Sequence, residues 1–215
     1  MHNTRSSTRL AFGLAFIALG AARVGIAQDE GVKQVQQLIK KADSTVQSIA
    51  DAKAQVQKTM EAYNAVVAPD VTDRRDAYKK LQKEMATSDK KRAEVSKKAD
   101  EMNVEADKLF KGWEASTGSL QNPDLKQRSE GRLKTAKDRY GEIRKMGQEA
   151  SGAYAPFIKA LQEQVTYLGH DLNPSAVASL KSETDKLNAQ AKDLYAAIDR
   201  TTAAANDNIS ALKSQ

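Results

Sequence analysis

The chain of 215 residues contains no cysteine, and this absence excludes several kinds of chemistry at once. It excludes disulfide bonds, thiolate zinc sites, a cysteine nucleophile and lipid attachment to a cysteine after export. Proline and glycine are also scarce, at 4 and 11 residues, and aromatic residues make up only 5% of the chain. Because strands are rich in β-branched and aromatic residues between frequent turns, this composition argues against a β fold. The abundance of Ala, Lys, Gln, Glu and Asp instead predicts an all-α protein of long helices.

Histidine is nearly absent, and its two positions do not suit a catalytic or metal site. His2 lies in the N-terminal segment, and His170, near a predicted helix end, fits a capping role. A single histidine cannot build a zinc site of the usual kind, and the Glu-x-x-His pair of di-iron bundles does not occur. Glycine-rich phosphate loops, nucleophile elbows and metalloprotease motifs are absent as well. We therefore expect no enzyme activity, no catalytic residue, no bound metal and no cofactor.

The N-terminus has the pattern of an export signal. Arg5 and Arg9 precede an uncharged run of 13 residues, Leu10–Ala22, which Arg23 and small residues follow. This run is shorter than the ~20 apolar residues that a spanning helix needs, and its flanks are typical of a cleavable signal peptide. We expect residues 1–27 to be removed after Ala27, and the mature domain, residues 28–215, to be periplasmic or secreted. An uncleaved N-terminal anchor is the alternative.

The charge of the chain argues against one class of partner. The formal net charge is +6, but three basic residues belong to the signal, so 31 basic and 28 acidic residues leave +3 on the mature chain. These charges are of mixed sign, and the protein is expected to leave the cytoplasm. Both points argue against a nucleic-acid partner. We expect unidentified envelope proteins as partners, with only peripheral contact to a membrane.

Proline, glycine and asparagine divide the mature chain into four similar segments. Asn122-Pro123-Asp124 and Asn173-Pro174 are helix starts, with Asn as the N-cap and Pro at the first helical position. Pro69 and Gly118 end two of the segments. We therefore predict helices over about residues 30–67, 72–116, 123–169 and 174–212.

Each segment carries apolar residues spaced alternately three and four apart, which predicts coiled-coil-like heptad packing. Because the connections are short, neighbouring helices run antiparallel, and we predict an elongated antiparallel four-helix bundle. The sequence leaves open whether the four stripes pack within one chain or whether two hairpins pair with a second copy in a homo-oligomer. The first stripe consists of Val32, Val35, Ile39, Ala42, Val46, Ile49, Lys53, Val56, Met60, Tyr63 and Val67.

Polar residues interrupt the stripes near the middle of the first two segments. They are Lys53, Ser88 and Arg92. Counting back from the turn near Pro69 places Lys53 opposite about Met85 to Ser88, and Arg92 opposite about Val46. A polar layer of this kind fixes helix register or contacts a ligand inside the bundle. The alternative is that the long side chains extend to the rim of the bundle.

Pro156 lies inside the third segment and predicts an irregular helix there. Because proline has no N–H, the carbonyl of Gly152 loses its helical hydrogen bond, and we predict a kink between Gly152 and Pro156. Gly147 lies on the apolar stripe, where a missing side chain permits close helix approach. A helix that is merely weak is the alternative.

Basic residues gather on the second and third segments. Lys83, Lys90 and Lys97 are seven residues apart on the outermost heptad position, and Arg132 and Arg139 follow on the third segment. The basic stretches of the two segments are expected to overlap partly in height, which favours a surface for an anionic envelope partner. An ordinary solvated face is the alternative, since acidic residues are interspersed: Asp73, Asp76, Glu84, Asp89, Glu94 and Asp100.

A series of residues between Leu109 and Leu180 resembles a known family. The series comprises Leu109-Phe110, Trp113-Glu114, Leu133, Tyr140, Ile143, Gln164-Val165, Leu168, His170, Leu172-Asn173, Ala176 and Ser179-Leu180. It resembles the domain of unknown function 2959, a bacterial family of exported helical proteins, and the resemblance covers most of the mature chain. It implies export and a helical fold, and it brings no activity, cofactor or site. Members are often lipoproteins, and this chain departs from them because it has no cysteine to carry a lipid.

These patterns favour a non-enzymatic interaction protein, an adaptor or scaffold that binds another envelope protein through its long helical faces. A basic periplasmic holdase chaperone, or a binder of anionic envelope material, is the second hypothesis. A small-ligand sensor or an enzyme, with its ligand near the predicted kink or the polar layer, is the third.

Overall fold

The computed structural model describes residues 24–213, and every regular element in this part of the chain is a helix. The helices are α1 (Val24–Val67), α2 (Arg74–Gly118), α3 (Pro123–His170), α4 (Pro174–Ser179) and α5 (Lys181–Lys213). The predicted all-α class is confirmed for these residues. Most of the predicted signal peptide lies outside the described residues, and the expected cleavage point after Ala27 falls in the first turn of α1.

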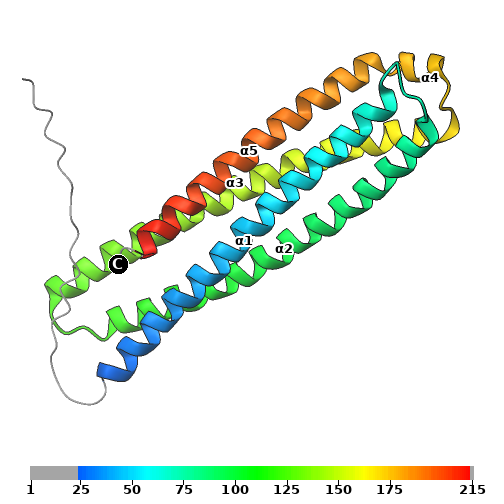
Figure 1. The fold of residues 1–215 in the computed structure, drawn as a ribbon. Helices are drawn as coiled ribbons and strands as arrows, with labels where there is room; N and C mark the ends of the chain where they lie inside the picture. Colours follow the sequence, from blue (N-terminus) through cyan, green and yellow to red (C-terminus); the bar gives the residue numbers. More distant parts are fainter. Residues whose placement is uncertain (1–23, 214–215) are drawn as a thin grey trace, which may run out of the picture.

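The four long helices lie along one another and alternate in direction, which gives the molecule an elongated shape (Figure 1). α1 packs most extensively on α2, α5 packs on α3, and α1 also contacts α5. The contact between α2 and α3 is the thinnest among these neighbouring long helices. The molecule is therefore two well-packed helix pairs joined mainly through α1 and α5, and its side between α2 and α3 is the most open.

Side chains at the helix starts explain where the chain turns. The carboxylate of Asp73 accepts a hydrogen bond from the amide of Asp76 (2.9 Å), which caps α2. Asn122 and Asn173 cap α3 and α4 in the same way, each followed by a proline at the first helical position. These caps satisfy amides that have no partner within the helix. The predicted starts at residues 123 and 174 coincide with those of α3 and α4, whereas α2 begins at Arg74 rather than at about residue 72.

The fourth predicted segment is divided into two helices. α4 ends at Ser179, and Leu180, with φ −85° and ψ 2°, separates it from α5. The Ser179 hydroxyl donates to the carbonyl of Ala176 (2.7 Å), a local bond that competes with continuation of the helix. The side chain of Leu180 is buried, so the break between α4 and α5 directs this apolar side chain into the core.

The larger apolar core lies at the end of the molecule that contains the α1–α2 turn and α4 (Figure 1). Large side chains fill it from all four long helices, among them Tyr63, Leu81, Phe157, Leu161 and Leu194. The fully buried Tyr63 hydroxyl forms hydrogen bonds with Gln164 and with Thr184 (2.7 Å). Burial accordingly raises the pKa of Tyr63. The core at this end is apolar, and the hydroxyl of its central residue, Tyr63, is fully hydrogen-bonded.

A glycine permits close packing in this larger core. The hydroxyl of Tyr78 on α2 donates to the carbonyl of Val165 on α3 (2.9 Å). A Cβ atom on Gly169 would lie only 2.6 Å from that hydroxyl oxygen. Gly169 therefore makes room for Tyr78 where α2 approaches the end of α3.

A smaller apolar core lies toward the opposite end. Its buried residues are Leu38, Ala106, Leu109 and Tyr140, with partly buried neighbours that include Leu212. α5 ends here, and the ammonium of its last described residue, Lys213, pairs with Asp43 of α1 (3.1 Å). The first turns of α1 and α3 and the last turns of α2 continue past this point, where α5 no longer accompanies them (Figure 1).

The contact between α1 and α2 is polar in its middle, which differs from the predicted stripe. Thr45, Ser48, Gln55 and Thr59 are buried, whereas Val46 and Ile49 are only partly buried and Val32 is 47% exposed. Small hydroxyl-bearing residues let two helices approach closely, and their hydroxyls bond to nearby carbonyls: Thr45 to Lys41 (2.8 Å), Ser48 to Thr45 (2.8 Å) and Thr59 to Gln55 (2.9 Å). In this middle part of α1 the buried side is thus rotated away from Val46 and Ile49, whereas Ala42, Val56, Met60 and Tyr63 of the predicted stripe are buried.

Candidate interaction surfaces

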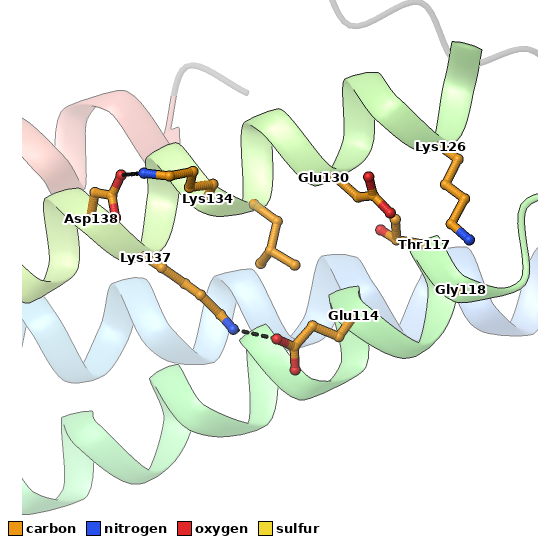
Figure 2. A pocket seen from close by; sticks show the side chains of 9 residues that line it. Glu114, Thr117, Gly118, Lys126, Glu130, Lys134, Lys137 and Asp138 are labelled. Carbon is orange, nitrogen blue, oxygen red and sulfur yellow. Dashed lines mark hydrogen bonds and ion pairs between the residues drawn. The ribbon is translucent and has the colours of Figure 1, made fainter. Parts of the chain in front are cut away.

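A groove lies between the end of α2 and the beginning of α3, where these two helices diverge (Figure 2). It consists of two adjoining open depressions of about 470 and 310 Å³. Glu114 and Lys137 line both depressions, and they form an ion pair across the groove. Figure 2 shows Lys126, Glu130 and Thr117 converging on the same space from the two helices. The groove is therefore lined by charges of both signs.

Aromatic residues form the apolar part of this groove. The rings of Phe110 and Tyr140 meet edge to face, with centroids 5.8 Å apart. The hydroxyl of Tyr140 donates to Asn103 (2.8 Å), and burial raises the pKa of Tyr140 to about 12. The ammonium of Lys137 lies 5.9 Å from the centroid of Phe110. The groove combines an apolar floor with a cation held at its edge.

Two hydrogen bonds from α2 fix α3 at the end of this groove. The indole N–H of Trp113 donates to the Ser129 hydroxyl (3.0 Å), and that hydroxyl also contacts the hydroxyl of Thr117 (2.6 Å). Trp113 is partly buried. It therefore packs at the end of the helix pair and positions the start of α3.

The predicted basic residues are all exposed. Lys83, Lys90, Lys97, Arg132 and Arg139 form no ion pair among the described residues. Their charges are free to interact with solvent or with a partner.

The lysines and arginines of this set do not lie at the same height. The bonds from Trp113 to Ser129 and from Tyr140 to Asn103 fix the register of α2 against α3. The two arginines lie between Ser129 and Tyr140, and hence level with the part of α2 between Asn103 and Trp113. The three lysines lie on the far side of Asn103, the nearest of them six residues or about 9 Å along the axis. Lys83, Lys90 and Lys97 therefore form a row separate from the two arginines.

Lys53 faces α5 rather than α2. Its ammonium pairs with Asp199 at 2.6 Å and lies 6.0 Å from the ring centroid of Tyr195. The positions of α1 that face α2 are occupied by Gln55 and Thr59 instead. Lys53 is therefore not opposite Ser88 in the contact between α1 and α2.

The other two residues of the predicted polar layer also have separate surroundings. Ser88 is buried and shares a hydrogen bond with Thr59 (2.8 Å) in the contact between α1 and α2. Arg92 is exposed, and its guanidinium lies 5.9 Å from the ring centroid of Tyr154 on α3. Lys53, Ser88 and Arg92 thus reach α5, α1 and α3 respectively and do not surround a common space.

α3 continues without a break through Gly152 and Pro156. Both residues are exposed, and a Cβ atom on Gly152 would meet nothing within 4 Å. Close by, the buried hydroxyl of Tyr154 has no hydrogen-bond partner, and burial raises its pKa to about 12. The position of Pro156 on the outer side of α3 explains how the helix accommodates the missing amide.

Two kinds of site are not found in the described residues. No group of His, Asp and Glu side chains there is arranged to hold a metal ion. No helix of this part is long and apolar enough to cross a membrane.

The groove was not predicted from the sequence. Its charged residues, among them Asp107, Lys111, Glu114 and Arg144, look like ordinary surface positions when each helix is considered alone. Only the register of α2 against α3, together with the thin contact between them, brings these side chains to one place. The hint available in the sequence was the cluster of aromatic residues near the second turn, Phe110, Trp113 and Tyr140.

Comparisons with known proteins give one result. Neither the curated proteins nor the solved structures contain a match to this chain. The family model described as "Protein of unknown function (DUF2959)" matches residues 25–212, which span all five helices. The resemblance noted in the sequence is thereby confirmed, and the chain belongs to the DUF2959 family of proteins of unknown function.

Proposed function

We propose that the protein is a non-enzymatic interaction protein of the bacterial envelope, an adaptor or scaffold that binds another protein along the α2–α3 groove. In this proposal residues 1–27 are an export signal, and the mature chain acts in the periplasm or outside the cell. The long helices act as an antiparallel four-helix bundle with heptad packing, which holds the groove open at one end.

The groove is the observation that carries this proposal. Its apolar floor includes Leu133, Phe110 and Tyr140, and it is open along its length. Five charged residues of its walls form no ion pair among the described residues. Three are basic and two acidic: Lys111, Lys126, Arg144, Asp107 and Glu130. An amphipathic helix of a partner, with an apolar face and flanking charges of both signs, fits such a surface.

A pull-down with matched charge reversals tests the proposal. The full chain, tagged at its C-terminus, is expressed in a bacterium and recovered with its partners at low and at high salt. The groove variant carries Lys111→Glu and Arg144→Glu, and the control carries Lys192→Glu and Arg200→Glu on the exposed side of α5. Both variants change the net charge equally, so a difference between them reports the location of the binding surface.

We expect the wild type and the control to retain one stoichiometric partner at high salt and the groove variant to lose it. An apolar interface survives high salt because screening weakens only its charged contacts. Equal retention by the groove variant would contradict the proposal. Diffuse binding that high salt abolishes in all three proteins would favour a holdase or a binder of anionic material instead.

A further inference from the structure

α2 carries a straight row of free basic residues on its outer face. Lys83, Lys90 and Lys97 are exposed and seven residues apart, so they span about 21 Å along the helix axis. α2 is one uninterrupted helix over this length, and its sequence there contains neither glycine nor proline. The inner side of α2 is occupied by α1. The three ammonium groups therefore share one face that no other part of the described chain covers.

Most of the acidic residues interspersed among these lysines are engaged elsewhere. The side chains of Asp89 and Asp100 have no ion pair or hydrogen bond among the described residues. The other four have partners: Asp73 caps α2, Asp76 pairs with Lys79, Glu84 accepts from Gln55 of α1, and Glu94 pairs with Lys91 and Lys98. Lys98 and Lys91 lower the pKa of Glu94, so that it stays charged and paired. None of these four acids therefore pairs with Lys83, Lys90 or Lys97.

An exposed apolar residue continues the row. Val104 occupies the next heptad position after Lys97, and at 52% it has the highest exposed fraction among the large exposed apolar residues of the described chain. Between the lysines the same face carries the short, exposed side chains of Ala86 and Ala93. These alanines are shorter than lysine, so they leave the three ammonium groups accessible to a flat partner.

We propose that this row, defined as Lys83, Lys90, Lys97 and Val104, lies on the headgroup surface of an anionic phospholipid bilayer. The lysines contact lipid phosphates, and Val104 enters the interface between headgroups and acyl chains. The long axis of α2 then lies parallel to the membrane. This inference does not depend on the α2–α3 groove, because none of its residues lines the groove.

The geometry favours a lipid surface over a soluble polyanion. A bilayer is flat over the length of the row and offers phosphates next to an apolar layer, which matches three lysines in line with an exposed valine. A soluble polyanion would use the lysines and gain nothing from Val104. The effect of Val104 on binding therefore distinguishes the two partners.

Vesicle sedimentation tests the proposal. The purified chain is mixed with vesicles of phosphatidylglycerol and phosphatidylcholine, with vesicles of phosphatidylcholine alone, and separately with inorganic polyphosphate. The row variant carries Lys83→Gln, Lys90→Gln and Lys97→Gln. The control carries Lys145→Gln, Lys192→Gln and Arg200→Gln, three exposed cations of α3 and α5. All proteins share the same N-terminal segment, so only differences between variants report on α2.

We expect binding to the anionic vesicles to fall about fivefold for each lysine removed, or about 100-fold for the row variant, and to fall much less for the control. Val104→Ser should weaken binding to these vesicles and leave binding to polyphosphate unchanged. Asp100→Asn, which removes the acid beside the row, should strengthen vesicle binding up to about fivefold. All of these variants replace exposed residues, so the fold is retained.

Three outcomes would overturn the proposal. One is equal loss of vesicle binding in the row variant and the control, which would show a response to net charge alone. Another is binding of the wild type to polyphosphate and not to anionic vesicles. The third is full vesicle binding by the row variant.

Discussion

The two ends of the molecule are built differently. At the end with the α1–α2 turn and α4, large side chains from all four long helices form one continuous core around Tyr63, Phe157 and Leu161. At the other end, where α5 ends, the buried cluster consists of only Leu38, Ala106, Leu109 and Tyr140. There the chain relies on individual hydrogen bonds and ion pairs, such as those of Trp113 and Lys137. The surface with the groove lies at this second end.

In the proposed function, this difference assigns stability to one end of the molecule and partner binding to the other. A well-packed core leaves no apolar surface for a partner, whereas an end with fewer large side chains leaves Phe110 partly exposed in a groove. The larger core can hold the four helices together while the opposite end remains open.

Truncating one leucine in each core should reveal the contrast directly. Leu161 is fully buried in the larger core, and Leu161→Ala should lower the free energy of unfolding by about 4 kcal/mol because it leaves a cavity that cannot collapse. Leu109 lies in the smaller core, where neighbours can move, and Leu109→Ala should cost about 2 kcal/mol. Urea denaturation followed by circular dichroism measures both. A larger loss for Leu109→Ala would contradict the contrast.

The polar contact between α1 and α2 should depend on its buried hydroxyl pair. Thr59→Val removes one partner of the 2.8 Å hydrogen bond and leaves the Ser88 hydroxyl unsatisfied, at a cost of about 1–3 kcal/mol. Adding Ser88→Ala should restore much of this stability, because both polar groups are then gone. A double-mutant cycle in urea measures the coupling. Additive losses would show that the two hydroxyls do not interact.

Two tyrosines should respond oppositely to loss of the hydroxyl. Tyr140 donates to Asn103, so Tyr140→Phe should cost about 1 kcal/mol, whereas the Tyr154 hydroxyl is buried without a partner and Tyr154→Phe should be neutral or stabilising. Both have their pKa raised from 10 to about 12, so the folded protein keeps these protons while the unfolded chain releases them. Stability should therefore fall as pH rises from 10 to 12, and each phenylalanine variant should reduce this fall. Thermal unfolding as a function of pH measures it, and an unchanged alkaline profile in both variants would contradict this assignment.

Alanine substitutions at two glycines of α3 should give the smallest difference in stability. A Cβ atom at Gly147 would lie 4.0 Å from Thr201, an ordinary contact, so Gly147→Ala should stabilise the protein by about 0.5–1 kcal/mol through helix propensity. At Gly169 the added atom would lie 2.6 Å from the hydroxyl of Tyr78, so Gly169→Ala should destabilise it. Melting temperatures of the two variants give opposite signs if α2 and α3 pack as described.

The starts of the helices were predicted well because the residues that cap them lie directly before them in the sequence. Asn122 and Asn173 cap helices where the sequence placed them, since an asparagine before proline satisfies free amides whatever surrounds it. The break at Leu180 was missed because no glycine or proline marks it. It results from a buried leucine and from the Ser179 hydroxyl bond, and the burial of that leucine depends on tertiary packing.

Contacts between helices were predicted less well. Heptad patterns favour large apolar residues, so they selected Val46 and Ile49 where α1 in fact buries Thr45 and Ser48. Lys53, which the same pattern placed opposite α2, instead pairs with Asp199 of α5. The groove depends on where α2 and α3 diverge, and the apolar pattern of a single helix does not predict that position. The places where sequence reasoning failed are those where two helices meet through small or polar residues.

The most direct test of the account is site-specific photo-crosslinking of the full chain in living bacteria. A photoreactive amino acid replaces Lys111 in the groove or, in a second protein, the exposed Lys159 beside the larger core. The account predicts one discrete crosslinked partner from position 111 and none from position 159. Crosslinking to the same partner from position 159 and not from position 111 would contradict it.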